Sequence, residues 1–207
     1  MSLIEIISTG SVAPACSKRH YSNRMLGGEQ MRIYPDCSVI KKTIEVGGLS
    51  KAELIQRLQQ SSISLNQYGE KLLYDDRFTT SEIKYSLEIV ELLVRDLGFP
   101  NGATLPEIYK QAKELRLQLC PPELGPYLRL EYVDQIEGNS GNPSQKNEAP
   151  SGSITIASEI ISDEDSFPKG FYVRKVDGVL WLRGYVADNL HVWNPDTRFI
   201  FKTDNGY

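Results

Sequence analysis

The 207-residue sequence has few of the residues that cross-link small secreted domains or bind metals. It contains three cysteines, an odd number without a CxxC pair, and only two histidines. This cysteine usage is more typical of free thiols in a reducing compartment than of a disulfide framework. Cys16, His20 and Cys37 are the best-spaced metal ligands, but a fourth ligand is lacking. We therefore expect neither a metal nor another cofactor.

Long apolar runs are absent as well. No window approaches the ~18 consecutive apolar residues of a membrane span, and the apolar start of the chain is interrupted by Glu5. No basic region precedes that start, as it would in a secretory signal. These absences predict a cytoplasmic protein without a membrane partner. Lys and Arg number 23 against 27 Asp and Glu, a net charge of −4, which argues against a protein that coats nucleic acid.

Catalytic motifs are also lacking. Ser140 lies in Gly-Asn-Ser-Gly-Asn, which misses the second glycine of a nucleophile elbow. Residues 163–165 are Asp-Glu-Asp, without the alternation and central glycine of a calcium loop. His191 stands beside Trp193, but no motif links it to a serine or cysteine, and such a histidine is most often a sheet-edge residue. The sequence favours a protein that is not an enzyme.

The composition is that of a globular protein, with 40% hydrophobic and 24% charged residues. Low apolar density predicts a loosely ordered segment over residues 1–35. A mainly helical α/β part is expected over 36–133 and an antiparallel β part over 152–207. Between them, residues 134–151 form a polar loop, and loops of this length are usually functional or disordered.

Helix caps mark the clearest local elements. Ser50 and Glu53 form a capping box that starts a helix ending near Gln60, and a second helix is expected from Leu65 to Tyr74. Thr104 and Glu107 form another box. The first two helices together resemble small helix–loop–helix DNA-binding modules such as SAP. Acidic residues offset the basic ones there, so no basic stripe forms and a packing role is expected.

Strand patterns occur at several places along the chain. Residues 83–97 fit a helical stripe and also alternate as a strand does, and their β-branched residues favour the strand. Gly125-Pro126 is expected to stop any helix. Further strands are expected at Ile40–Val46, Leu128–Tyr132, Ile154–Ile161 and Arg198–Lys202. The predicted fold class is α+β, a helix-rich N-terminal half with a small antiparallel sheet in the C-terminal half.

The strongest strand signal is a hairpin over residues 171–185. Asp177-Gly178 lies between two alternating runs, as in a type I′ turn. The two-residue loop sets the cross-strand pairs, and alternation then places four side chains on one face. These are Tyr172, Arg174, Trp181 and Arg183.

Two interpretations of this face stay open. Each arginine can simply stack on its neighbouring ring. Alternatively the face binds a ligand, with the rings stacking on a base or apolar group and arginine holding a phosphate or carboxylate. We take Tyr172, Arg174, Trp181 and Arg183 as candidate ligand-binding residues.

Three stretches resemble a group of bacterial proteins of similar size that have no established activity. They are Arg95–Phe99 with Gly102-Ala103-Thr104, Leu119–Pro126, and Gly178–Tyr185. The resemblance covers roughly residues 43–202 and includes no catalytic motif, so it implies no functional residue. Proteins that look like this are occasionally labelled helicases, but this chain has no GxxxxGK[ST] phosphate loop.

The sequence therefore favours a non-enzymatic ligand-binding or protein-interaction protein. Its expected partner is a protein or a small anionic or aromatic ligand. Two alternatives stay open: a nucleic-acid-associated accessory factor, and an enzyme with a site near His191.

Overall fold

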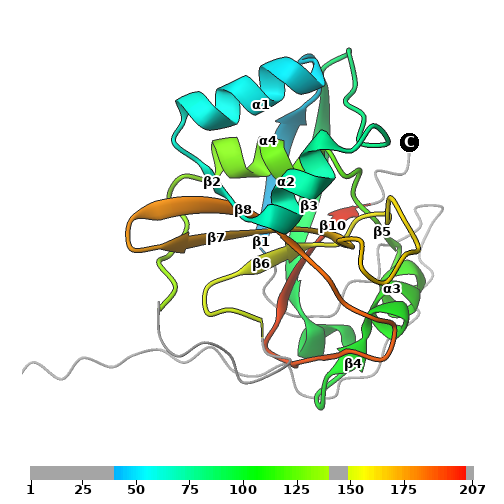
Figure 1. Cartoon of the computed structure of the whole chain (residues 1–207). Helices are drawn as coiled ribbons and strands as arrows, with labels where there is room; N and C mark the ends of the chain where they lie inside the picture. Colours follow the sequence, from blue (N-terminus) through cyan, green and yellow to red (C-terminus); the bar gives the residue numbers. More distant parts are fainter. Residues whose placement is uncertain (1–39, 140–148, 204–207) are drawn as a thin grey trace, which may run out of the picture.

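A mixed β-sheet of eight strands forms the centre of the computed structural model, which describes residues 40–139 and 149–203 (Figure 1). The strands of this sheet are β1 (Ile40–Val46), β2 (Ser64–Leu65), β3 (Tyr85–Leu93), β5 (Leu117–Gln118), β6 (Ile154–Ile156), β7 (Gly170–Val176), β8 (Val179–Tyr185) and β10 (Arg198–Thr203). Their order is β1-β3-β10-β6-β7-β8-β2, and β5 pairs with β10. A separate two-stranded sheet joins β4 (Ala103–Thr104) to β9 (Val192–Trp193).

Helices cover both faces of the sheet. They are α1 (Lys51–Gln60), α2 (Gln67–Tyr74), α3 (Leu105–Glu114), α4 (Leu124–Glu131) and a 3₁₀ turn, η1 (Val94–Leu97). The larger of two apolar cores contains Leu58 of α1, Leu72 of α2 and Leu128 of α4. The smaller core contains Ile108 of α3 and Phe199 of β10. Figure 1 shows α1, α2 and α4 together on one side of the β7–β8 hairpin, with α3 and β4 on the other side.

The predicted fold class is wrong. β3 from the first half of the chain pairs with β10 near its end, and helices and strands alternate along the chain instead of separating into halves. The sheet is large and mixed, because β10 runs parallel to β6 and β2 runs parallel to β8. Local periodicity shows which face of a strand is buried but carries no signal for a partner far away in the sequence.

Several local predictions are confirmed. The strand favoured within residues 83–97 is present as β3, although residues 94–97 form the 3₁₀ turn η1, and β1 has the predicted bounds. Helix α1 begins at the predicted capping box, in which Ser50 N donates to Glu53 Oε2 at 2.9 Å and Glu53 N donates to Ser50 Oγ at 3.3 Å. The segment 1–35 lies outside the described residues.

The predicted strand at Leu128–Tyr132 is wrong, since most of it belongs to helix α4. Pro126 does not stop this helix because it lies in the first turn, where a backbone N–H has no helical partner to lose. Leu128 and Arg129 are both buried, so the alternation of apolar and charged residues did not reflect alternating exposure. The predicted strand at Ile154–Ile161 is shorter than expected and ends at Ile156.

Cys120 lies in the larger core, where its Sγ is 3.7 Å from the carbonyl oxygen of Ile200. Burial raises the pKa of this thiol from 9.0 to about 12, so almost no reactive thiolate forms at pH 8. In a variant with Cys16→Ser and Cys37→Ser, we expect iodoacetamide to alkylate Cys120 about a hundredfold more slowly in the native protein than in denaturant. Mass spectrometry measures both rates, and equally rapid alkylation of the native protein would contradict the burial.

Candidate functional site

The β7–β8 hairpin forms with the predicted register. Asp177 and Gly178 have φ angles of +49° and +75°, as a type I′ turn requires. Tyr172 lies opposite Arg183, and Arg174 lies opposite Trp181. Phe171, Val173 and Leu182 point into the larger core. The four candidate side chains therefore share the opposite face of the hairpin, as the sequence predicts.

Arg174 is engaged within the protein. Its Nε donates to the carbonyl oxygen of Ser151 at 3.0 Å, and its Nη2 donates to that of Asn139 at 2.6 Å. Asn139 and Ser151 lie in the two described segments of the predicted polar loop region, which we call its first stem (134–139) and second stem (149–153). Arg174 thus ties the two stems of that loop to the hairpin, and we assign it a positioning role beside the face.

Other contacts fix the same stems. Gln135 Nε2 donates to the carbonyl oxygens of Gly152 at 2.9 Å and Val173 at 3.1 Å. Glu137 Oε1 accepts a hydrogen bond from Gly178 N at 2.6 Å, which attaches the first stem to the hairpin turn. The stems are therefore held along β7 by side chains as well as by backbone contacts.

Arg129 of α4 is the residue of this network that the sequence reasoning missed. It is fully buried, and its guanidinium donates to Gln135 Oε1 and to the carbonyl oxygens of Tyr132 and Arg174. No carboxylate within residues 40–139 or 149–203 pairs with it, and burial lowers its pKa to about 10. The only sequence signal was an arginine between two leucines, Leu128 and Leu130, which we interpreted as an alternating strand.

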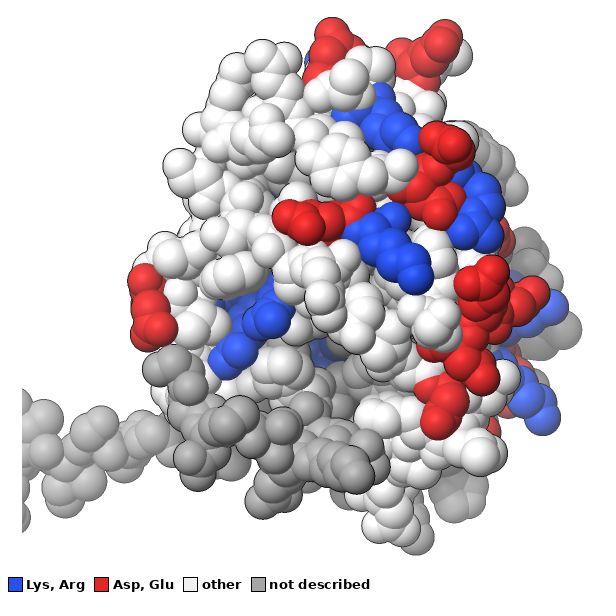
Figure 2. All heavy atoms as spheres, viewed as in Figure 1, with Lys and Arg blue, Asp and Glu red and all other residues white. Residues whose placement is uncertain are grey.

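Arg183 differs from Arg174 and Arg129 in having no polar partner among residues 40–139 and 149–203. Its guanidinium carbon lies 5.1 Å from the ring centre of Trp181 and 5.9 Å from that of Tyr172. Its Nε is buried without an acceptor, and no ion pair reaches it within the part of the chain that the structure describes. Figure 2 shows basic side chains on the surface in the left half of the view, near the hairpin. An unpaired, stacked guanidinium keeps its outer donors available for an anion.

The rings differ in their accessibility. Tyr172 is only 9% exposed, whereas Trp181 and Arg183 are half-buried. Burial raises the pKa of the Tyr172 hydroxyl, and the guanidinium groups of Arg183 and Arg174 oppose that rise. Tyr172 is therefore an uncharged, buried ring that packs beneath Arg183. Trp181 and Arg183 are more accessible than Tyr172 on this face.

His191 lies apart from this face. It lines an open hollow of about 490 Å³ together with Asp165 and Asp188, and its ring packs edge-on against Trp193 with centres 5.0 Å apart. The hollow has no serine or cysteine in its lining. Nor do the described residues include three or more His, Cys, Asp or Glu side chains grouped to hold a metal. Cys16, His20, Cys37 and Ser140 lie outside the described residues.

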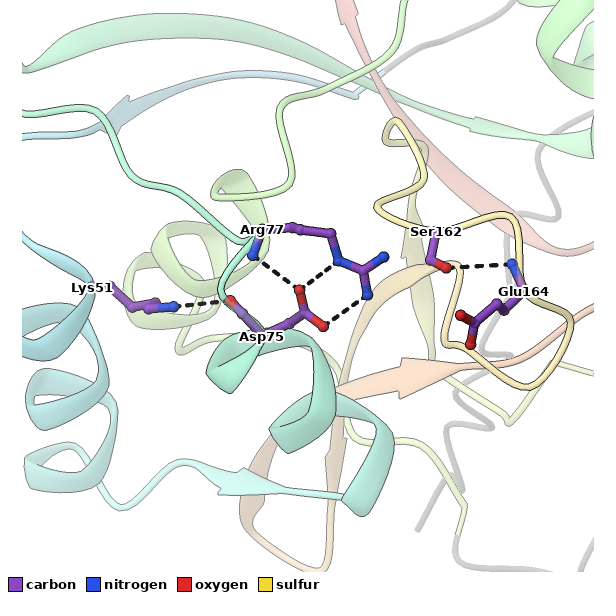
Figure 3. A network of polar contacts seen from close by, with 5 residues as sticks. All are labelled: Lys51, Asp75, Arg77, Ser162 and Glu164. Carbon is purple, nitrogen blue, oxygen red and sulfur yellow. Dashed lines mark hydrogen bonds and ion pairs between the residues drawn. The ribbon is translucent and has the colours of Figure 1, made fainter.

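Two cations near the end of α2 are held by contacts within the protein. Arg77 donates from Nε and Nη2 to the two carboxylate oxygens of Asp75 at 2.8 and 2.9 Å, and Lys51 Nζ donates to the Asp75 carbonyl at 2.9 Å (Figure 3). These Arg77 bonds hold the pKa of Asp75 well below its usual range. Lys51 and Arg77 are thus both engaged by Asp75, just after the end of α2.

Comparison with known proteins does not assign the chain to a family. No protein-family model matches the chain, and neither a curated protein nor a solved structure is detectably similar to it. Among the described residues, no helix is long and apolar enough to cross a membrane. The functional argument therefore rests on the geometry of the chain's own residues.

Proposed function

We propose that the chain is a non-enzymatic binding protein whose β7–β8 face holds a ligand with an anionic group next to a planar or apolar part. The observation that supports this proposal best is the Arg183 guanidinium, stacked against Trp181 and Tyr172 without an acidic partner among the described residues. An anion would accept hydrogen bonds from the outer nitrogens of Arg183, while the planar part packs against Trp181.

The backbone beside Arg183 is fixed before any ligand arrives. Asn66 Oδ1 accepts a hydrogen bond from Gly184 N at 2.8 Å, and Asn66 Nδ2 donates to the Gly184 carbonyl at 3.0 Å. On the same edge, Ser64 of β2 pairs with Trp181. A site that is already ordered loses little conformational entropy on binding, which favours affinity.

The binding test uses Trp181 as its own reporter. The chain has two tryptophans, so a Trp193→Phe variant leaves Trp181 as the only one. The Nε1 of Trp193 has no hydrogen-bond partner among the described residues, so this substitution leaves no hydrogen-bond acceptor unpaired. We expect a nucleoside monophosphate to change the Trp181 fluorescence saturably, and inorganic phosphate or the uncharged nucleoside to bind more weakly.

In this background, Arg183→Gln is expected to weaken binding of the nucleoside monophosphate about tenfold or more, because a charged hydrogen-bond donor contributes roughly 1.5–3 kcal/mol. The matched control is Arg198→Gln, which removes the same charge from an exposed arginine whose Nη1 is paired with Glu91 Oε1 at 2.5 Å. The control should bind as the parent does. Equal affinity of the Arg183 variant, or no fluorescence change with any planar anion, would refute the proposal.

The alternative of a nucleic-acid accessory factor involves the same two residues, because bases stack on rings and phosphates bind guanidinium groups. A face with one available arginine would contact few phosphates, so its affinity should depend only weakly on salt. Titration with a single-stranded oligonucleotide at two salt concentrations separates the two functions. Tight binding that falls steeply with salt would favour the nucleic-acid alternative.

A further inference from the structure

The connection between β8 and β9 exposes a group of apolar side chains around one hollow. Leu190 is 84% exposed and Val186 is 41% exposed. The hollow of about 490 Å³ is lined by Asp165, Val186, Ala187, Asp188, Leu190 and His191. Single exposed apolar residues are common on proteins, but a group of them rimmed by polar residues marks an interaction surface.

The connection holds its shape through its own contacts. Asp188 Oδ1 accepts a hydrogen bond from Leu190 N at 2.9 Å, and the Asp188 carbonyl accepts one from His191 N at 3.3 Å. The His191 ring packs edge-on against Trp193, whose ring in turn contacts those of Tyr185 at 5.3 Å and Phe199 at 5.1 Å. Leu190 is therefore presented to solvent by a turn that is anchored on the smaller core.

The rim of the hollow is acidic. Asp165 and Asp188 line it, and Asp163 and Glu164 precede Asp165 in the same loop. Lys169 is buried and its Nζ donates to the carbonyl oxygens of Ser162 and Glu164. Arg77 interacts electrostatically with Glu164, whereas no ion pair within residues 40–139 or 149–203 reaches Asp165 or Asp188, so these two carboxylates carry the charge of the rim. Figure 2 shows acidic side chains in the right half of the view, with basic side chains beside some of them.

We propose that this hollow is a docking site for a basic, apolar peptide segment of a partner protein. A leucine-like side chain of the segment would pack against Val186 and Leu190, and a lysine or arginine beside it would pair with Asp165 and Asp188. A second copy of the chain fits less well, because a symmetric dimer would place the two acidic rims against each other. A small molecule would be mostly left in water, since the hollow is open.

This site is separate from the Trp181–Arg183 face and shares no residue with it. The test uses the full chain and three short fluorescent peptides of equal length, which contain Arg with Leu, Arg with Ser, or Glu with Leu. Fluorescence anisotropy is expected to show binding of the Arg–Leu peptide, with the other two at least about tenfold weaker.

Two variants locate the site. Leu190→Ser and the double variant Asp165→Asn, Asp188→Asn should each weaken the Arg–Leu peptide about tenfold, whereas the melting temperature stays close to that of the parent. The asparagine at 188 keeps an oxygen that can accept the Leu190 N–H. The matched control is Ile83→Ser, which removes an apolar side chain that is 77% exposed elsewhere on the surface.

Four outcomes would overturn the proposal. In the peptide titrations these are that none of the peptides binds, or that the Glu–Leu peptide binds as tightly as the Arg–Leu peptide. In the variants these are that Ile83→Ser weakens binding as much as Leu190→Ser, or that sedimentation shows Leu190→Ser dissociating a dimer. The last result would make a second copy of the chain the occupant. Loss of nucleoside monophosphate binding in Arg183→Gln is a separate readout, so the two proposals fail independently.

Discussion

Gly184→Ala is expected to destabilise the protein by about 3 kcal/mol, because it overpacks a contact between two backbones. A Cβ at this position would lie 2.5 Å from the carbonyl carbon of Tyr68 and 2.7 Å from Gly69 N in α2. Gly184 also bonds to the side chain of Asn66 through both its N–H and its carbonyl. A shift of β8 that relieved the clash would therefore break these bonds as well.

Urea denaturation followed by circular dichroism measures this effect. The control is Gly178→Ala at the hairpin turn, where nothing lies within 4 Å of the added Cβ and the cost comes from the φ angle of +75° alone. That strain costs about 1–2 kcal/mol. A loss at Gly184 no larger than the loss at Gly178 would show that β8 and α2 are not packed as closely as described.

Arg129→Ala is expected to cost about 3 kcal/mol or more, since it combines a cavity with orphaned acceptors. The buried guanidinium currently satisfies Gln135 Oε1 and the carbonyl oxygens of Tyr132 and Arg174. Without it, the first loop stem loses its link to α4. Hydrogen exchange should therefore become faster in residues 135–139 and 149–153 than in β3.

The comparison with Arg129→Met separates packing from charge. Methionine fills most of the space and removes a buried cation, so we expect a loss of only about 1–2 kcal/mol. Equal losses for the two variants would mean that the hydrogen bonds, and not the filled volume, determine the stability. Unchanged exchange in the stems of either variant would contradict the role assigned to Arg129.

The pKa of Arg129 shows whether its positive charge stabilises or destabilises the folded state. Burial lowers this pKa from 12.5 to about 10, so the folded state disfavours the charged form. The penalty is fully present below pH 10 and disappears as the pH rises from about 10 towards 12.5, because the unfolded chain binds more protons in that window. At neutral pH the hydrogen bonds of Arg129 therefore act against a desolvation cost.

Local chemistry in the sequence predicted the β7–β8 hairpin and the start of α1. The Asp177-Gly178 turn determines the register of β7 and β8, because two residues with positive φ leave one way to pair the flanking strands. The capping box at Ser50 likewise predicted where α1 begins. Both signals act between residues that are close in the chain.

The sequence by itself therefore determined that Tyr172, Arg174, Trp181 and Arg183 share one face, since side-chain direction alternates along every strand. Only the tertiary structure decided which arginine is available. Arg174 donates to the carbonyls of Ser151 and Asn139, whereas the buried Nε of Arg183 has no acceptor among the residues that the structure describes. The order of the eight strands and the burial of Arg129 were decided in the same way, because contacts between distant segments depend on how the whole chain packs and leave no periodic mark in the sequence.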